Sequence, residues 1–182
     1  MPQAIGPQLL SVGESVGGAS GAGPLMTDVN GLLIDPGTAP TLGTFTPTIV
    51  PDTLGDWAPT YTTQTGSYLQ IGRLVMIGFH VAGTTNAYST AAGTLSISGF
   101  TQTVNNSAAL NGVGGLTNVT GLDTSSASHD GWTPYGRSNL SKISFTRQAK
   151  GSNPAGSASA SVTQLPASRT FDIRGICFIV TT

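Results

Sequence analysis

The stretch Tyr61–Val81, YTTQTGSYLQIGRLVMIGFHV, restricts the fold of this chain more than any other segment. Its apolar and polar residues alternate, and the alternation is interrupted at Gly72-Arg73. Because successive side chains of a β-strand point to opposite faces, this alternation indicates strands. A two-residue Gly-X loop suits a type II′ turn, since glycine adopts a positive φ without steric cost. The stretch therefore predicts a β-hairpin.

Both faces of the return strand carry apolar residues. One face holds Val75, Ile77, Phe79 and Val81, and the other holds Leu74, Met76, Gly78 and His80. We expect a second cover over the latter face, and in a small sandwich this cover is often another subunit. Leu74 and Met76 are therefore candidate interface residues. In the last expected strand, Asp172 and Arg174 lie at alternate positions with Ile176, Phe178 and Val180, which puts all five side chains on one face. Either Gly175 marks a bulge there, or that face passes from water into an interface.

The composition favours an all-β fold. Only 8% of the residues are charged, against about 25% in an average soluble domain. Ser and Thr take their place, and Thr is tolerated on the outer face of a sheet. Closely spaced turn signals predict an antiparallel, jelly-roll-like β-sandwich. The expected strands are Thr44–Val50, Trp57–Gln64, Ser67–Ile71, Leu74–Val81, Gly93–Ser98, Phe100–Val104, Leu116–Leu122, Lys142–Arg147, Ala158–Gln164 and Thr170–Val180.

Residues 1–42 differ from the rest of the chain. The run Gly13–Pro24 consists mostly of small residues and is too poor in large side chains to bury a core of its own. We interpret residues 1–42 as an extended N-terminal arm and residues 43–182 as the sandwich domain. The apolar residues with which the arm could dock on a partner are Leu9, Leu10, Leu32, Leu33 and Ile34. The arm is acidic and residues 131–182 are basic, so it could also lie across the basic part of its own or a neighbouring subunit.

Few residues support chemistry. The net charge of −1 gives no reason to expect nucleic acid or an anionic membrane as partner. His80, His129 and Cys177 match no zinc spacing, and no cofactor motif is present. Asp52 and Asp56 could form a glycosidase-like pair, but solvated turn residues are the more common reading. We therefore expect no enzyme, no metal and no cofactor, and a buried, inert thiol at Cys177.

One aromatic cluster could form a partner-binding surface. It lies in His129–Arg137, HDGWTPYGR, where Trp132, Tyr135 and Arg137 could stack on a sugar ring or anchor a protein. The alternative is that Trp132 closes one end of the sandwich core. The latter is the more common use of such a tryptophan.

Three blocks in this order resemble the C-terminal β-domains of tailed-bacteriophage virion proteins, especially tail fibres. They are Gly43–Ile49 (GTFTPTI), Tyr61–Val81 with its centre QTGSYLQIG, and Gly93–Phe100 (GTLSISGF). The chain has Gln70 where the family usually has Lys, and it lacks a Leu-Pro after its Ile-Ser-Gly phrase. The resemblance covers residues 43–100.

The resemblance implies a homotrimeric virion-surface protein without catalysis. Since no stalk precedes Gly43, we expect a capsid decoration (cement) protein that binds the major capsid protein through its arms. The alternative is a tail-fibre or spike component in the phage tail, in contact with tail proteins and a host-surface glycan receptor. Leu74 and Met76 would then lie in the trimer interface.

Overall fold

The computed structural model describes residues 40–106, 112–123, 129–149 and 158–181, together with two short strands at 26–27 and 33–34. The chain divides into two units, Met1–Thr38 and Ala39–Thr182. In the first unit, β1 (Met26–Thr27) pairs antiparallel with β2 (Leu33–Ile34). The second unit begins its first strand at Thr41, inside the segment that we interpreted as the arm.

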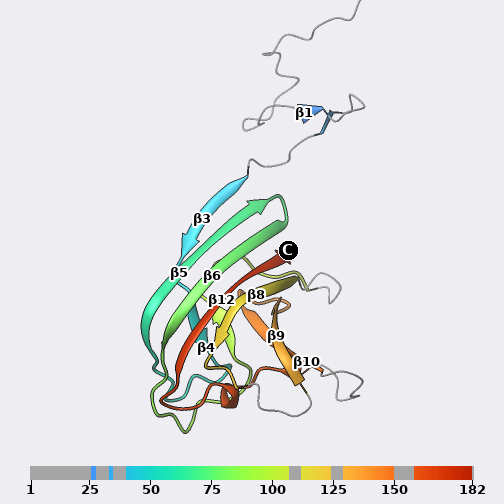
Figure 1. Ribbon diagram of the computed structural model, residues 1–182. Coiled ribbons are helices and arrows are strands. Elements are labelled where there is room, and N and C mark those ends of the chain that lie inside the picture. The colour runs from blue at the N-terminus through green and yellow to red at the C-terminus, as the bar shows by residue number, and fades with distance from the viewer. Residues whose placement is uncertain are drawn as a thin grey trace, which may run out of the picture. The chain divides into compact units, whose positions relative to one another are not determined.

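The second unit is built from two antiparallel sheets, as predicted (Figure 1). The first sheet has the order β3-β5-β6-β12-β8, and the second has β11-β10-β7-β4 with β9 paired to β10. Neither sheet closes on itself, so the fold is an open sandwich. The strands are β3 (Thr41–Phe45), β4 (Thr48–Val50), β5 (Thr60–Ile71), β6 (Leu74–Thr84), β7 (Ser96–Ser98), β8 (Val113–Thr120), β9 (His129–Gly136), β10 (Ile143–Ala149), β11 (Ala158–Ser159) and β12 (Thr170–Val180).

The predicted hairpin is confirmed as β5 and β6, the long curved pair in Figure 1. Ile71 pairs with Leu74 across the turn. Gly72 has φ +56°, whereas Arg73 is not among the described residues with positive φ, which agrees with a type II′ turn. The predicted strands Trp57–Gln64 and Ser67–Ile71 are one strand, with a register shift between Tyr61 and Thr63.

The core lies between the two sheets. The inward face of β6 contributes Val75, Ile77 and Val81, each with no exposed surface. From the second sheet, Ile143 and Phe145 of β10 are equally buried, and the rings of Phe79 and Phe145 meet edge to face at 6.5 Å. Such burial contributes about 1.5–3 kcal/mol for each large apolar side chain.

The strand predictions were wrong in several places. Phe100–Val104 is not a strand: Gly99 turns the chain with φ +111°, and only Val104 forms a bridge, to Thr181. Conversely, His129–Gly136, which is absent from the predicted strands, forms strand β9. Among the described strands it pairs with β10 alone, and an edge strand tolerates Pro134 because one side of its backbone needs no ladder partner.

A bulge at Gly175 was one of two alternatives from the sequence, and a register shift does lie between Arg174 and Gly175, in the pairing with β8. β12 pairs with β6 without interruption from Thr170 to Val180. The register shift is on the β8 side, where Arg174 pairs with Asn118 and Gly175 with Leu116. The extra residue therefore belongs to β8, and β12 keeps one continuous outer face.

A short 3-10 helix, η2 (Val162–Gln164), replaces the end of the predicted strand Ala158–Gln164. Ser161 caps it, accepting from the Thr163 N–H, while the Gln164 side chain accepts from the Ser161 N–H at 2.6 Å. This reciprocal capping box satisfies donors that a strand would have paired.

Candidate functional site

The outer face of the first sheet, turned away from the core, has a polar half and an apolar half. The strand registers place Thr65, His80, Arg174 and Asn118 in one row across β5, β6, β12 and β8. Towards the Gly72 turn, the same face carries apolar residues. Phe178 pairs with Met76, and Val180 pairs with Leu74. A single sheet face thus changes from polar to apolar along its strands.

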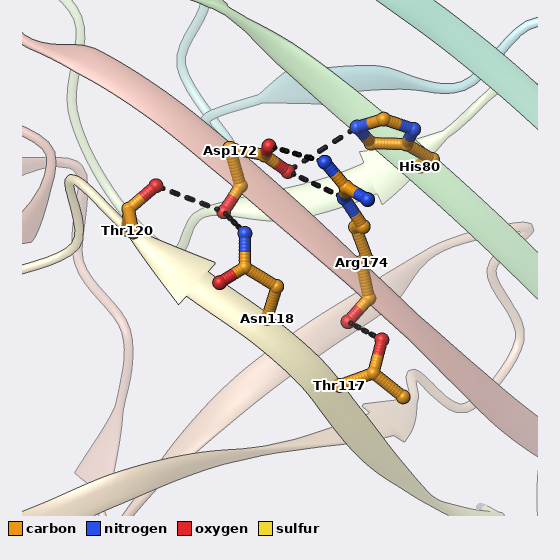
Figure 2. A network of polar contacts seen from close by, with 6 residues as sticks. All are labelled: His80, Thr117, Asn118, Thr120, Asp172 and Arg174. Atoms are coloured by element: carbon orange, nitrogen blue, oxygen red, sulfur yellow. Dashed lines mark hydrogen bonds and ion pairs between the residues drawn. The ribbon is translucent and has the colours of Figure 1, made fainter.

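The polar half is centred on the carboxylate of Asp172 (Figure 2). Arg174 donates to it twice, from Nε at 3.0 Å and from a terminal nitrogen at 2.8 Å. His80 Nε2 lies 3.2 Å from the same carboxylate. The hydrogen bond from Arg174 is the main reason that the pKa of Asp172 lies below its usual value, and Asp172 in turn raises the pKa of Arg174.

Strand β8 completes this network. Thr120 Oγ1 donates to the Asp172 backbone carbonyl at 3.3 Å, and Thr117 Oγ1 donates to that of Arg174 at 3.4 Å. Figure 2 shows these contacts running between adjacent strands rather than into a cavity. The arrangement neutralises the charges on this half of the face and orders their side chains.

The apolar half is exposed on the single chain. Leu74 is 49% exposed and Phe178 41%, while Met76 is half-buried. Leu42, Ile71 and Val113 are also large exposed apolar residues. Sequence reasoning identified Leu74 and Met76 but missed these three. Ile71 could have been predicted, because it ends an alternating strand on the same face as Leu69. Leu42 and Val113 could not, because they join this face only through the pairing of distant strands.

Asp56 is held by a loop distant in sequence, at residues 89–91. Its carboxylate accepts hydrogen bonds from the backbone N–H groups of Ser89, Thr90 and Ala91 and from the hydroxyls of Ser89 and Thr90, all at 2.7–3.1 Å. The Thr90 N–H bond is the largest of the causes that lower the pKa of Asp56 far below its usual value. A carboxylate so engaged is an ionised structural group.

Asp52, the other carboxylate considered for catalysis, pairs with Arg137. Thr94 donates its N–H to Asp52 at 3.1 Å, and Lys142 Nζ lies 3.9 Å away. Partial burial works to raise the pKa of Asp52, but these donors and cations outweigh it and the pKa is lowered. This contact joins the acidic N-terminal part of the chain to its basic C-terminal part.

The three residues of the aromatic cluster do not form one surface. Trp132 is only 7% exposed and belongs to the core, with the Arg147 guanidinium 5.9 Å from its ring centroid. Tyr135 is three residues from Trp132 on β9, so the two side chains lie on opposite faces of the strand. The Tyr135 hydroxyl is 3.1 Å from the Ser159 hydroxyl. Arg137 is engaged with Asp52.

Of the other candidate residues, Cys177 is fully buried, and burial raises the pKa of its thiol to about 12. In the described ranges, no three His, Cys, Asp or Glu side chains gather in a way that could hold a metal ion. Those ranges also contain no helix that is long and apolar enough to cross a membrane. The arm residues Leu9, Leu10 and Leu32 lie outside the described residues, and Leu33 and Ile34 form β2.

Comparison with known proteins gives one structural likeness. No family model and no curated protein matches the sequence. The fold is similar to part of the crystal structure of the Dettilon tailspike protein (gp208), with a TM-score of 0.50 and 19% sequence identity. The likeness covers 76% of this chain but only 24% of the tailspike chain. At this identity it establishes a shared fold.

Proposed function

We propose that this chain is a structural protein of a bacteriophage tail, in which residues 43–182 form a β-sandwich module of a spike or fibre. The observation that carries the proposal is the likeness of 76% of the chain to part of a tailspike. The three sequence blocks between Gly43 and Phe100 support it independently, because they resemble tail-fibre domains in order and spacing. The fold likeness favours the tail over the decoration of a capsid.

Localisation in the virion tests this proposal. Virions of the source phage would be dissociated, their tails separated from their capsids, and the chain assigned by mass spectrometry and by immunogold labelling. We expect the chain in the tail fraction. Gold particles spread over the capsid faces, or purified chain that binds empty shells, would contradict the tail and favour a decoration protein.

We further propose that the chain acts as a homotrimer. What supports this is the exposed apolar half of the outer sheet face, which includes Leu74 and Phe178 at 49% and 41% exposure. Apolar patches of this kind mark interaction surfaces. Light scattering on the full chain should give three times its mass of 18.4 kDa. A mass of one or two chains would contradict the homotrimer.

We also propose that this module binds rather than cleaves. Both Asp52 and Asp56 are engaged by donors within the fold, which supports a structural role for each. Host-surface polysaccharide incubated with the full chain should therefore keep its size on gel filtration. Cleavage that disappears in the Asp52→Asn variant would contradict this proposal.

Receptor binding would appear as blocked phage adsorption by the isolated chain.

A further inference from the structure

The apolar half of the outer face contains a continuous ridge. Strand registers align one large apolar residue from each of the five strands of the first sheet. Three of them are exposed by 41–79%, and the two on β5 and β6 are half-buried. We call this row the ridge; its members are Leu42, Leu69, Met76, Phe178 and Val113.

The next row of the same face, two residues along each strand, is a trough. Its members are Thr44, Ser67, Gly78, Ile176 and Gly115. All of them except Ile176 have small side chains or none. A groove of about 670 Å³ is lined by four members of this row, Thr44, Ser67, Gly78 and Ile176, with Leu42, Leu69 and Met76 of the ridge along its side. Gly115 continues the row beyond the groove, at the β8 edge of the sheet. A Cβ on Gly115 would meet nothing within 4 Å, and one on Gly78 nothing nearer than 3.6 Å. The trough therefore has room for side chains that the single chain does not supply.

We propose that a second copy of this chain supplies them: the ridge of one subunit packs into the trough of its neighbour. This inference rests on the proposed homotrimer and names its contact surface. The ridge and the trough are adjacent rows of one sheet, so both cross the same five strands and have the same length. In the trimer the contact is head-to-tail: the ridge of one subunit meets the trough of the next, and such contacts generate a closed ring when the rotation closes. Two faces that exchanged ridge and trough reciprocally would instead give a dimer, which the mass from light scattering distinguishes.

The exposed area also suits a second copy. Leu42, Val113, Ile71, Leu74 and Phe178 are 41–79% exposed. Together they offer roughly 500 Å² of apolar surface, and their half-buried neighbours bring the patch towards the roughly 800 Å² per partner of a standard interface. No residue of the ridge or the trough carries a charge. The patch therefore offers no charge by which to select an acidic or basic partner.

The polar half of the face fixes the register of this contact. Arg174 and His80 lie in the row next to the trough, paired with Asp172. If a neighbour's ridge shifted by one row, it would cover the Arg174 side chain, which is 49% exposed. Removing such an ion pair from water carries a desolvation penalty. The row therefore opposes the shifted arrangement.

Filling the trough tests the proposal. The Gly115→Leu variant adds an apolar side chain where the single chain has space. The Thr84→Leu control adds the same side chain to the same outer face, at the exposed end of β6, outside both the trough and the Asp172 network. Phe178→Thr shortens the ridge. By light scattering over a dilution series, Gly115→Leu and Phe178→Thr should raise the subunit dissociation constant at least about tenfold, a change of 1.4 kcal/mol. Thr84→Leu should leave it unchanged. Circular dichroism checks that each variant folds.

A nonspecific apolar patch makes the opposite prediction, because an added Leu would strengthen association. Gly115→Leu that associates as tightly as the natural chain would therefore overturn the ridge-and-trough contact, as would a natural chain that is monomeric.

Disulfide trapping is independent of variant stability. A Leu69→Cys chain mixed with a larger, tagged Ser67→Cys chain should give mainly the mixed disulfide. Random pairing, in which the mixed disulfide makes up about half of the total and each symmetric disulfide about a quarter, would count against the contact. Neither outcome depends on whether the chain lies in the tail or on the shell.

Discussion

At the scale of single residues, the Asp56 carboxylate couples stability to pH. Five donors from Ser89, Thr90 and Ala91 stabilise its charged form in the folded chain only, so its folded pKa lies below its unfolded pKa. A lowered pKa stabilises the fold above the unfolded pKa of about 3.9, and this contribution is lost as the pH falls further.

We therefore expect Asp56→Asn to lower the melting temperature at neutral pH. The gap to the natural chain should stay constant down to about pH 5 and shrink below about pH 4, where the unfolded carboxylate takes up a proton. Thermal unfolding followed by circular dichroism across this range measures the gap. A gap that does not change with pH would contradict the coupling.

Cys177 provides a second prediction at this scale. Its side chain has no exposed surface, and burial raises the pKa of its thiol to about 12. Alkylation requires an accessible thiolate. Native protein should therefore resist iodoacetamide near pH 8.5, the ordinary thiol pKa. Mass spectrometry should show one adduct after unfolding in guanidinium. Rapid labelling of the native chain would contradict the buried position of this residue in β12.

At the scale of the strand, a buried hydroxyl pair joins β7 to β10. Ser96 and Ser144 are both fully buried, they are cross-strand partners, and their hydroxyl oxygens lie 2.6 Å apart. Removing one hydroxyl leaves the other unsatisfied in the core, which costs about 1–3 kcal/mol. Removing both leaves no orphaned group and can be nearly neutral.

The double-mutant cycle tests this pair. Urea unfolding should give Ser96→Ala and Ser144→Ala each a lower free energy of unfolding than the natural chain. The double variant should lose less than the sum of the two single losses. If the two losses simply add, the hydroxyls do not interact and the 2.6 Å contact has no energetic role.

Local patterns predicted the strands whose own residues alternate. The β5–β6 hairpin followed from alternation and the Gly72 turn. β9 was missed because Gly131, Pro134 and Gly136 are typical of loops, although an edge position tolerates them. The ridge could not be predicted, because Val113 and Phe178 become neighbours only through the pairing of β8 with β12. Register between distant strands is not a property of either strand alone.

At the scale of the whole molecule, the outer face of the first sheet carries apolar residues that no other part of the described chain covers. Its inner faces bury Ile77 and Ile173 completely, whereas Leu74 and Phe178 on the outer face are 49% and 41% exposed. Strands that carry apolar residues on both sides gain stability only when a further layer covers the second side. If that layer is another copy, folding and assembly become one equilibrium.

This coupling makes stability depend on concentration. A partner that binds only the folded chain adds RT ln(1 + [L]/Kd) to the free energy of unfolding, about 2.7 kcal/mol at a hundredfold excess over Kd. The melting temperature of the natural chain should therefore rise with protein concentration in scanning calorimetry. Phe178→Thr should flatten this dependence and lower the melting temperature only slightly at the lowest concentration, because Phe178 is already 41% exposed in the single chain. A concentration-independent melting temperature in the natural chain would mean that its second face stays uncovered.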